Sequence, residues 1–141
     1  YGQAQAADRV GVLISQVVEE LGLHGTVAEV GLSFEVGIAG SRLSTAQRQK
    51  LSLARALLKR PDILILSEAT ASLDSATQAG IMDSLLADFD GRCLIWAVQR
   101  VSMASGFDEI LVMRQGRLME RGSFAELSES NEYVKEMLAS E

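Results

Sequence analysis

Residues 43–74, LSTAQRQKLSLARALLKRPDILILSEATASLD, contain the pattern that decides the fold. Ser44 followed three residues later by Gln47 is a capping-box pattern, and the apolar residues after it return at helical spacing until a proline ends the run. Residues 63–66 form a continuous apolar run that is too short for a helix and is typical of a parallel strand covered on both faces. The stretch therefore predicts a helix over about residues 45–59 and then a buried strand.

A second helix and a second strand are predicted to follow. Ser75 with Gln78 is another capping-box pattern, and the apolar residues 93–98 come after an Asp-Gly break. Within this strand we expect Cys93 to be a buried small hydrophobe and Trp96 to be a core residue rather than a nucleotide-stacking platform. A strand, helix, strand unit implies a right-handed crossover and an α/β fold, with functional residues at the carboxyl ends of the strands.

The remaining sequence predicts shorter elements. Asp8 is expected to cap a first amphipathic helix that ends at Gly22, and the glycine-rich residues 25–42 predict short elements and loop. We interpret His24 as a surface residue. Towards the C-terminus the predicted elements are a hairpin of residues 109–113 and 117–121 around Gln115-Gly116, a helix capped by Ser123 with Glu126, and a last helix that includes residues 133–138.

Composition bounds the class of protein. The chain has 141 residues, of which 48% are hydrophobic, and a formal net charge of −6. The length suits a single domain with one hydrophobic core. The excess of acidic residues argues against a nucleic-acid partner, because binding one would require a basic face on the protein. No apolar stretch reaches the roughly 20 residues that span a bilayer, so the chain itself is expected to be soluble. Because the sequence begins at Tyr1 rather than Met, we expect an upstream segment in the natural protein.

This order of motifs resembles the nucleotide-binding domains of ATP-binding cassette proteins. In that family residues 43–47 and the helix after them correspond to the signature motif, the strand ending at Ser67-Glu68 to the Walker B strand, and residues 69–74 to the D-loop. The resemblance implies a partial P-loop NTPase (RecA-like) core with a helical signature subdomain. It places the subdomain at residues 1–60 and the C-terminal part of the α/β ATPase core at residues 61–141.

One motif of that family is missing from the sequence. No Gly-x-x-x-x-Gly-Lys-Ser/Thr occurs, so no residues here can wrap the β- and γ-phosphates as phosphoryl-transfer sites require. The resemblance therefore implies a C-terminal fragment that lacks the P-loop strand. We expect this fragment alone not to hydrolyse ATP.

The start of the signature helix is the predicted cofactor-binding site, formed by Ser44, Thr45, Ala46 and Gln47. Free backbone N–H groups and aligned peptide dipoles favour an anion there, although an ordinary capped helix would show the same pattern. The resemblance implies that this end contacts the γ-phosphate of ATP held by a partner domain. The family usually has two glycines where this chain has Thr45 and Ala46, so we expect the partner's site to be weakened.

The predicted catalytic residues are Glu68, Asp74 and Gln99. The resemblance implies that Glu68 polarises the attacking water and that the residue before it holds Mg²⁺ through water. That residue is Ser67, a neutral and weaker partner than a carboxylate. Asp74 matches the D-loop, which in the family crosses the dimer interface, and can also cap the next helix. Gln99 stands where the family has a histidine, and it can donate a hydrogen bond but cannot carry the charge.

The motifs at residues 68–70, 99–100 and 116–123 are similar to those of exporters. The leading hypothesis is an ATP-binding domain of an exporter, with ATP and Mg²⁺, a second nucleotide-binding domain in a homodimer or heterodimer, and transmembrane domains as partners. It would lie at the cytoplasmic face of the cell membrane. Two alternatives remain: a regulatory cassette that binds nucleotide and dimerises without hydrolysing it, and a soluble ATPase of the family with no transport role. The transported substrate stays open.

Overall fold

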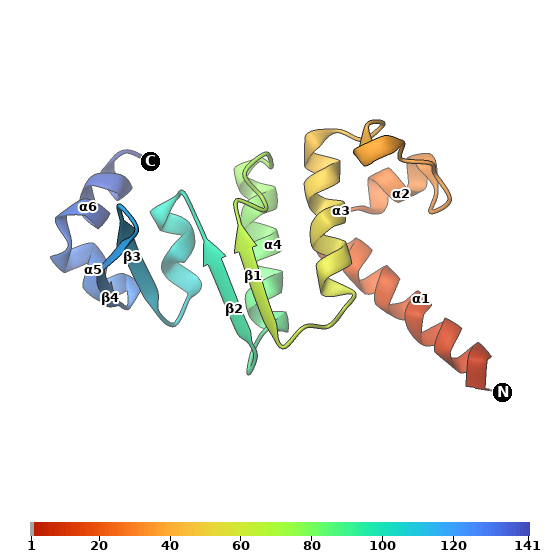
Figure 1. The fold of residues 1–141 in the computed structure, drawn as a ribbon, viewed down its shortest axis with the longest axis horizontal. Coiled ribbons are helices and arrows are strands. Elements are labelled where there is room, and N and C mark those ends of the chain that lie inside the picture. The colour runs from red at the N-terminus through yellow and green to blue at the C-terminus, as the bar shows by residue number, and fades with distance from the viewer. Residues whose placement is uncertain (1) are drawn as a thin grey trace. The chain divides into compact units, whose positions relative to one another are not determined.

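A computed structural model describes residues 2–141, with side chains of the first helix described from residue 10 onward. Contacts divide the chain into two compact units, residues 1–95 and residues 96–141. Figure 1 shows helices and strands in both, so the predicted α/β class is confirmed. The predicted boundary between residues 60 and 61 rests on motifs and stays a prediction.

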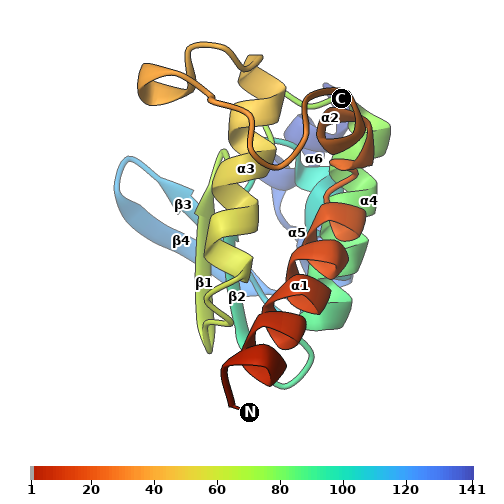
Figure 2. The same cartoon turned by 90° about the vertical axis from the view of Figure 1, so that its right-hand side faces the viewer.

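The first unit begins with three α-helices. They are α1 (Gly2–Glu20), α2 (His24–Val30) and α3 (Thr45–Leu57), with a single 3-10 turn, η1 (Ile38–Gly40), before α3. Helices α1 and α3 contact each other, as Figure 2 shows. The side chains that α1, α3 and the turn after α1 bury are apolar: Val17, Leu21, Leu23, Leu53, Ala54 and Leu57.

The first helix is longer than predicted. Because α1 begins at Gly2, Asp8 lies inside it and is not its cap. The predicted exit is confirmed: Gly22 follows with a φ of +57°, and its N–H donates to the Glu19 carbonyl at 3.0 Å. The short elements predicted for residues 25–42 are confirmed as α2 and η1, and His24 is exposed at the start of α2 as expected.

Strand β1 (Ile63–Ser67) pairs with β2 (Cys93–Ala97) in a two-stranded sheet. The prediction that β1 is covered on both faces is wrong for this chain. Leu64 and Leu66 are buried, whereas Ile63 and Ile65 are 60% and 69% exposed. Side chains alternate across a strand, so one sheet face packs inward and nothing in residues 2–141 covers the other.

The exposed face continues on β2. Cys93 is exposed, contrary to the prediction that it is a buried hydrophobe, and Ile95 is 50% exposed. Trp96, predicted to be core, is half-buried. The side chains of β1 and β2 are mostly apolar on both faces of the sheet, which is typical of strands that are buried on both faces. The described residues of this chain by themselves cover only one of the two faces.

Helix α4 (Ser75–Asp88) lies between the two strands in sequence and buries Ile81, Met82 and Leu85. Its predicted cap, Ser75 with Gln78, is wrong. Asp74 caps the helix instead, with extended backbone angles (φ −66°, ψ 158°) and a carboxylate that accepts from the Thr77 N–H. Asp74 lies one residue before Ser75 and is also a favoured N-cap residue. In this structure it is the Asp74 carboxylate that caps the helix.

The second unit contains the predicted hairpin. Strands β3 (Ile110–Arg114) and β4 (Arg117–Gly122) are antiparallel, and both turn residues, Gln115 and Gly116, have positive φ. Two positive φ values suit the twist of a two-residue hairpin turn.

Helices complete the second unit. The 3-10 helix η2 (Val101–Gly106) precedes the hairpin, and α5 (Phe124–Ser130) and α6 (Glu132–Ala139) follow it. The capping box of Ser123 with Glu126 at α5 and the predicted last helix are confirmed. The buried core of this unit is Val112, Leu127 and Val134.

Candidate functional site

The start of α3 has the capping box that the sequence predicts. The Ser44 hydroxyl accepts from the Gln47 N–H at 3.1 Å, and the Gln47 side-chain oxygen accepts from the Ser44 N–H at 2.8 Å. The next two N–H groups, of Thr45 and Ala46, belong to the first helical turn and find no acceptor within the described part of the chain. These two N–H groups can donate hydrogen bonds to an anion.

Arg48 adds positive charge to the same helix end. Its guanidinium donates to the Leu43 carbonyl at 2.8 Å and to the Thr45 hydroxyl at 3.0 Å. Sequence reasoning did not single out this residue; the signal was its spacing of three from Thr45 on a helix. Since Thr45 accepts from Arg48, its own hydroxyl proton can be donated outward. The substitution of threonine for glycine therefore adds a donor as well as bulk.

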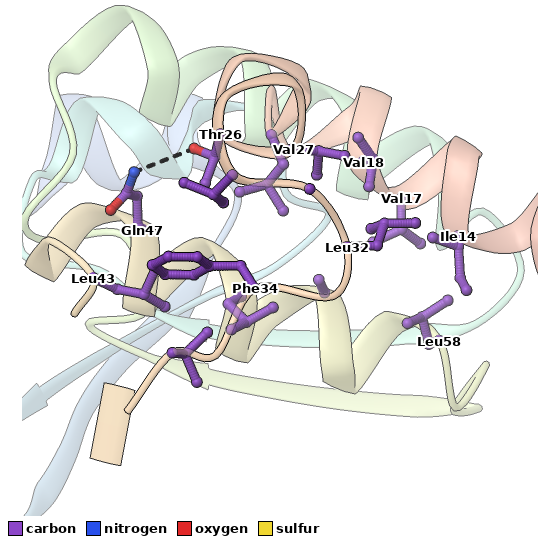
Figure 3. A pocket seen from close by; sticks show the side chains of 16 residues that line it. Ile14, Val17, Val18, Thr26, Val27, Leu32, Phe34, Leu43, Gln47 and Leu58 are labelled. Atoms are coloured by element: carbon purple, nitrogen blue, oxygen red, sulfur yellow. Dashed lines mark hydrogen bonds between the residues drawn. The ribbon is translucent and has the colours of Figure 1, made fainter. Parts of the chain in front are cut away.

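Gln47 also faces an apolar cavity of about 180 Å³ between α1, α2, residues 31–36 and α3. Its side-chain amide donates to the Thr26 hydroxyl at 3.4 Å, across the rim of the cavity, as Figure 3 shows. The other lining side chains are aliphatic or aromatic, Phe34 and Leu43 among them. Gln47 is thus held by Ser44 on one side and by Thr26 on the other.

Ser67 and Glu68 lie where β1 ends. Ser67 is the last residue of the strand, and Glu68 follows with a φ of +51°, a backbone region that residues other than glycine rarely adopt. Both side chains are exposed. The Glu68 carbonyl accepts from the Ala71 N–H at 3.1 Å, so the chain turns sharply at this point. The turn presents the carboxylate at the carboxyl end of the strand.

Residues 68–74, which we call the acidic loop, are held from two helices. Thr70 is 3% exposed, and its carbonyl accepts from the side-chain amide of Gln78 in α4 at 2.5 Å. Ser72 donates its N–H to the side-chain oxygen of Gln49 in α3 at 3.1 Å. The structure therefore joins the acidic loop to α3, which begins at the predicted phosphate-binding residues.

Asp74 ends the acidic loop. Its carboxylate accepts from the Thr77 hydroxyl at 2.6 Å and from the Thr77 N–H at 2.9 Å. These bonds, the hydroxyl first, lower the pKa of Asp74, so the carboxylate is ionised at neutral pH. The capping role is observed, and the predicted role at a dimer interface stays a prediction.

Gln99 belongs to the second unit, two residues after β2, and is exposed. The following 3-10 helix is tied down by Glu141, whose carboxylate accepts from the Val101 N–H, the Ser102 N–H and the Ser102 hydroxyl. Sequence reasoning did not single out Glu141, and nothing in its pattern marks it. The other predicted site residues, numbered 44–47, 67, 68 and 74, all lie in the first unit.

The candidate site residues suit a phosphate group better than a divalent metal. The Thr45 and Ala46 donors with the Arg48 guanidinium fit a phosphate group. A divalent metal is a poor fit to the chain by itself, because no cluster of three or more His, Cys, Asp or Glu side chains occurs among the described side chains of residues 10–141, and Ser67 is neutral. Across the same residues, no helix is long and apolar enough to cross a bilayer.

Comparisons with known proteins find similar proteins for most of the chain. The family model described as ABC transporter matches residues 5–71. The chain is 44% identical over 97 residues to an ATP-dependent lipid A-core flippase of Xylella fastidiosa, covering 69% of this chain and 16% of that protein. It is also 44% identical over 96 residues to ABC transporter 1 of Ajellomyces capsulatus, covering 68% of this chain and 7% of that protein.

A solved structure matches most of the fold. It is that of a bacterial Atm1-family ABC exporter with ATP bound, with a TM-score of 0.85 and 32% identity over 92% of this chain and 23% of that one. The chain thus spans less than a quarter of the length of each of these relatives.

Proposed function

This chain belongs to the ATP-binding cassette transporter family, and we propose that it is part of the ATPase domain of an exporter. In the proposed assembly it pairs with a second nucleotide-binding domain, equal or different, and with transmembrane domains at the cytoplasmic face of the membrane. The observation that carries the proposal is the placement of Glu68 at the end of β1, on a loop bonded to the helix that Ser44 caps. The fold match to an exporter with ATP bound supports it.

The proposed roles follow from the contacts. Thr45 and Ala46 donate backbone hydrogen bonds to a terminal phosphate of ATP held mainly by the partner domain, and Arg48 supplies positive charge there. Glu68 orients and polarises a water molecule for attack, and Asp74 shapes the partner's site across the interface. Bound Mg²⁺ would stabilise the charge that develops on the phosphates. This chain offers the ion only the weak Ser67 hydroxyl.

The open sheet face supports a larger ATPase core. Ile63, Ile65, Cys93 and Ile95 are exposed on one side of the β1–β2 sheet. A two-stranded sheet with one uncovered apolar face is only marginally stable in water. We propose that a further part of the core, containing the phosphate-wrapping loop that this sequence lacks, packs on this face. The chain by itself is then expected to be inactive.

The test of the catalytic role is Glu68→Gln in the full-length protein. The amide keeps the size of the side chain but cannot act as a base, so turnover of ATP should fall by about 10²- to 10⁴-fold. Glu19→Gln, the same change at an exposed position of α1, is the matched control and should retain turnover. If Glu68→Gln hydrolyses ATP at the wild-type rate, the proposed role of Glu68 is wrong.

A titration of the chain itself with Mg²⁺-ATP tests the proposed incompleteness. Trp96 fluorescence or heteronuclear NMR should detect no saturable binding at about millimolar nucleotide, because the chain presents donors from one helix end only. Saturable binding at about micromolar nucleotide would mean a complete nucleotide site, and the proposed division of the site between two chains would be overturned.

A regulatory cassette is the second candidate, favoured by Ser67 and Gln99. Both are neutral where the family has a carboxylate and a histidine. In a weakened but working site, the double change Ser67→Asp with Gln99→His should raise turnover. In a regulatory cassette, Glu68→Gln should leave the turnover of the assembled transporter unchanged, because another subunit does the chemistry.

A further inference from the structure

Gln49 is the residue that joins the acidic loop to α3. It lies in the second turn of the helix, half-buried, and its side-chain oxygen accepts from the Ser72 N–H at 3.1 Å. The two residues are 23 positions apart in sequence, so this contact is tertiary and not a local turn. The bond links the helix that carries Gln49 to the loop that donates to it.

The loop around Ser72 is also bonded to α4 and within itself. The Thr70 carbonyl accepts from Gln78, and the Leu73 N–H donates to the same carbonyl at 2.9 Å. Asp74 is bonded to Thr77. These contacts tie the loop to α4, whereas the bond to Gln49 ties it to the helix that starts at the phosphate-facing residues. A movement of α3 would therefore be transmitted to the loop through Gln49.

We propose that Gln49 is a positioning residue. It holds the acidic loop, and Asp74 with it, at a fixed position relative to the phosphate-facing start of α3. The inference rests on the proposed function for its catalytic consequence. Ser72 is two residues from Asp74, and Gln49 is two residues from Gln47 of the capping box. Contact with phosphate at Thr45 and the placement of Asp74 thus share one hydrogen-bonded connection. Gln49 itself touches no reacting atom in this scheme.

The decisive variants keep or remove the acceptor on a side chain of similar length. Gln49→Met removes the oxygen, and Gln49→Glu keeps it; all three residues have similar helix propensity, so α3 itself is undisturbed. Gln16→Met is the matched control, since it makes the same chemical change at an exposed position of α1.

The first readout is amide hydrogen exchange at Ser72 in this chain, measured by NMR. Losing one hydrogen bond should raise the exchange rate of the Ser72 N–H by about tenfold in Gln49→Met, and Gln49→Glu and Gln16→Met should stay near wild type. An unchanged Ser72 rate in Gln49→Met would overturn the proposal, because the bond would then hold nothing in place.

The second readout is steady-state ATP turnover by the full-length protein. A misplaced loop should lower kcat by about 10- to 100-fold in Gln49→Met while the KM for ATP changes little, because Gln49 does not bind nucleotide. Recovery of kcat in Gln49→Glu supports the positioning role.

Failure of this inference and failure of the proposed function give different results. If Glu68→Gln abolishes turnover but Gln49→Met does not alter kcat, the positioning role is overturned and the proposed function stands. If neither change affects turnover, the proposed function fails and the catalytic consequence of Gln49 fails with it. The exchange rate at Ser72 decides the structural part in both cases.

Discussion

The carboxylate of Asp74 has one observed role, as a helix cap, and one proposed role, at a domain interface. It caps α4 through Thr77, and in the proposed assembly it also faces a partner domain. A carboxylate can do both, because each of its two oxygens has more than one acceptor site and Thr77 uses one site on each. The cap orients the side chain, so the structural role is a condition for the proposed functional one.

Asp74→Ala should reveal the cap through its pH dependence. Since the hydrogen bonds lower the pKa of Asp74 below its ordinary value of 3.8, its contribution to stability is present above that pH and is lost as the pH falls through the lowered pKa. We expect the variant to unfold at lower urea concentration than wild type at about pH 7, and the gap to be smaller at about pH 2.

Asp83→Ala is the control for this prediction, because Asp83 is an exposed carboxylate in the interior of the same helix. A gap between Asp74→Ala and wild type that is the same at both pH values would contradict an ionised cap.

Glu20 at the end of α1 has the opposite shift. Burial, and secondarily the charge of Asp88, raises the pKa of Glu20 above its ordinary value of 4.5. Its ionisation is therefore less favourable in the folded state than in the unfolded state, and stability is lost as the pH rises through the raised pKa. Glu20→Gln should raise Tm at about pH 7 and have little effect at about pH 3, where wild-type Glu20 is neutral too. A lower Tm for the variant at neutral pH would contradict the assigned cause.

At the scale of elements, helix starts decide where the site residues lie. Ser44 and Ser75 both open an S-x-x-Q pattern, but only the first is a capping box. At α4 the glutamine of the pattern, Gln78, is 5% exposed and bonds the Thr70 carbonyl instead. Its amide thus supports the acidic loop, and Asp74 takes over the capping of the helix.

Ser44→Ala should destabilise the folded chain by about 1 kcal/mol, the usual cost of losing a serine cap. Denaturant unfolding monitored by far-UV circular dichroism measures it. Ser52→Ala, at an exposed position inside the same helix, should change stability by less than about 0.5 kcal/mol. Equal effects of the two changes would mean that the Ser44 hydroxyl contributes nothing as a cap.

At the scale of the whole molecule, the uncovered face of the β1–β2 sheet is the feature that the proposed larger core explains. Three isoleucines and the single cysteine are exposed there, and none of the four side chains is charged. An apolar face of this kind costs free energy in water and favours burial against another apolar surface.

Cys93 provides the test of that burial. In this chain a maleimide reagent should modify the exposed Cys93 rapidly under native conditions. In the full-length protein, where the remaining core is proposed to cover the sheet, the rate should fall by about 100-fold or more and return on denaturation. Equal rates in both proteins would contradict the proposed packing. Cys93→Ser in the full-length protein identifies labelling at any other cysteine.

The sequence by itself determined the element order, the capping box at Ser44, the hairpin at Gln115-Gly116 and the family resemblance. These depend on residues close together in the chain: a helix start needs a side chain within three residues, and a two-residue turn needs positive φ at adjacent positions. Glu68, Ser67 and Asp74 could be assigned as candidates because the motif fixes their order. The comparisons confirm the family, while the roles of these residues stay predictions.

Only the tertiary structure decided what covers each strand and what holds the acidic loop. The alternation of burial in β1 depends on which other segments are present to pack on it, and the apolar run at residues 63–66 is the same whether one face is covered or both. Likewise, Gln49 and Gln78 look like ordinary helix residues in the sequence. Their bonds to Ser72 and Thr70 arise because folding brings α3 and α4 to the same loop, and local patterns do not encode which distant backbone group a side chain meets.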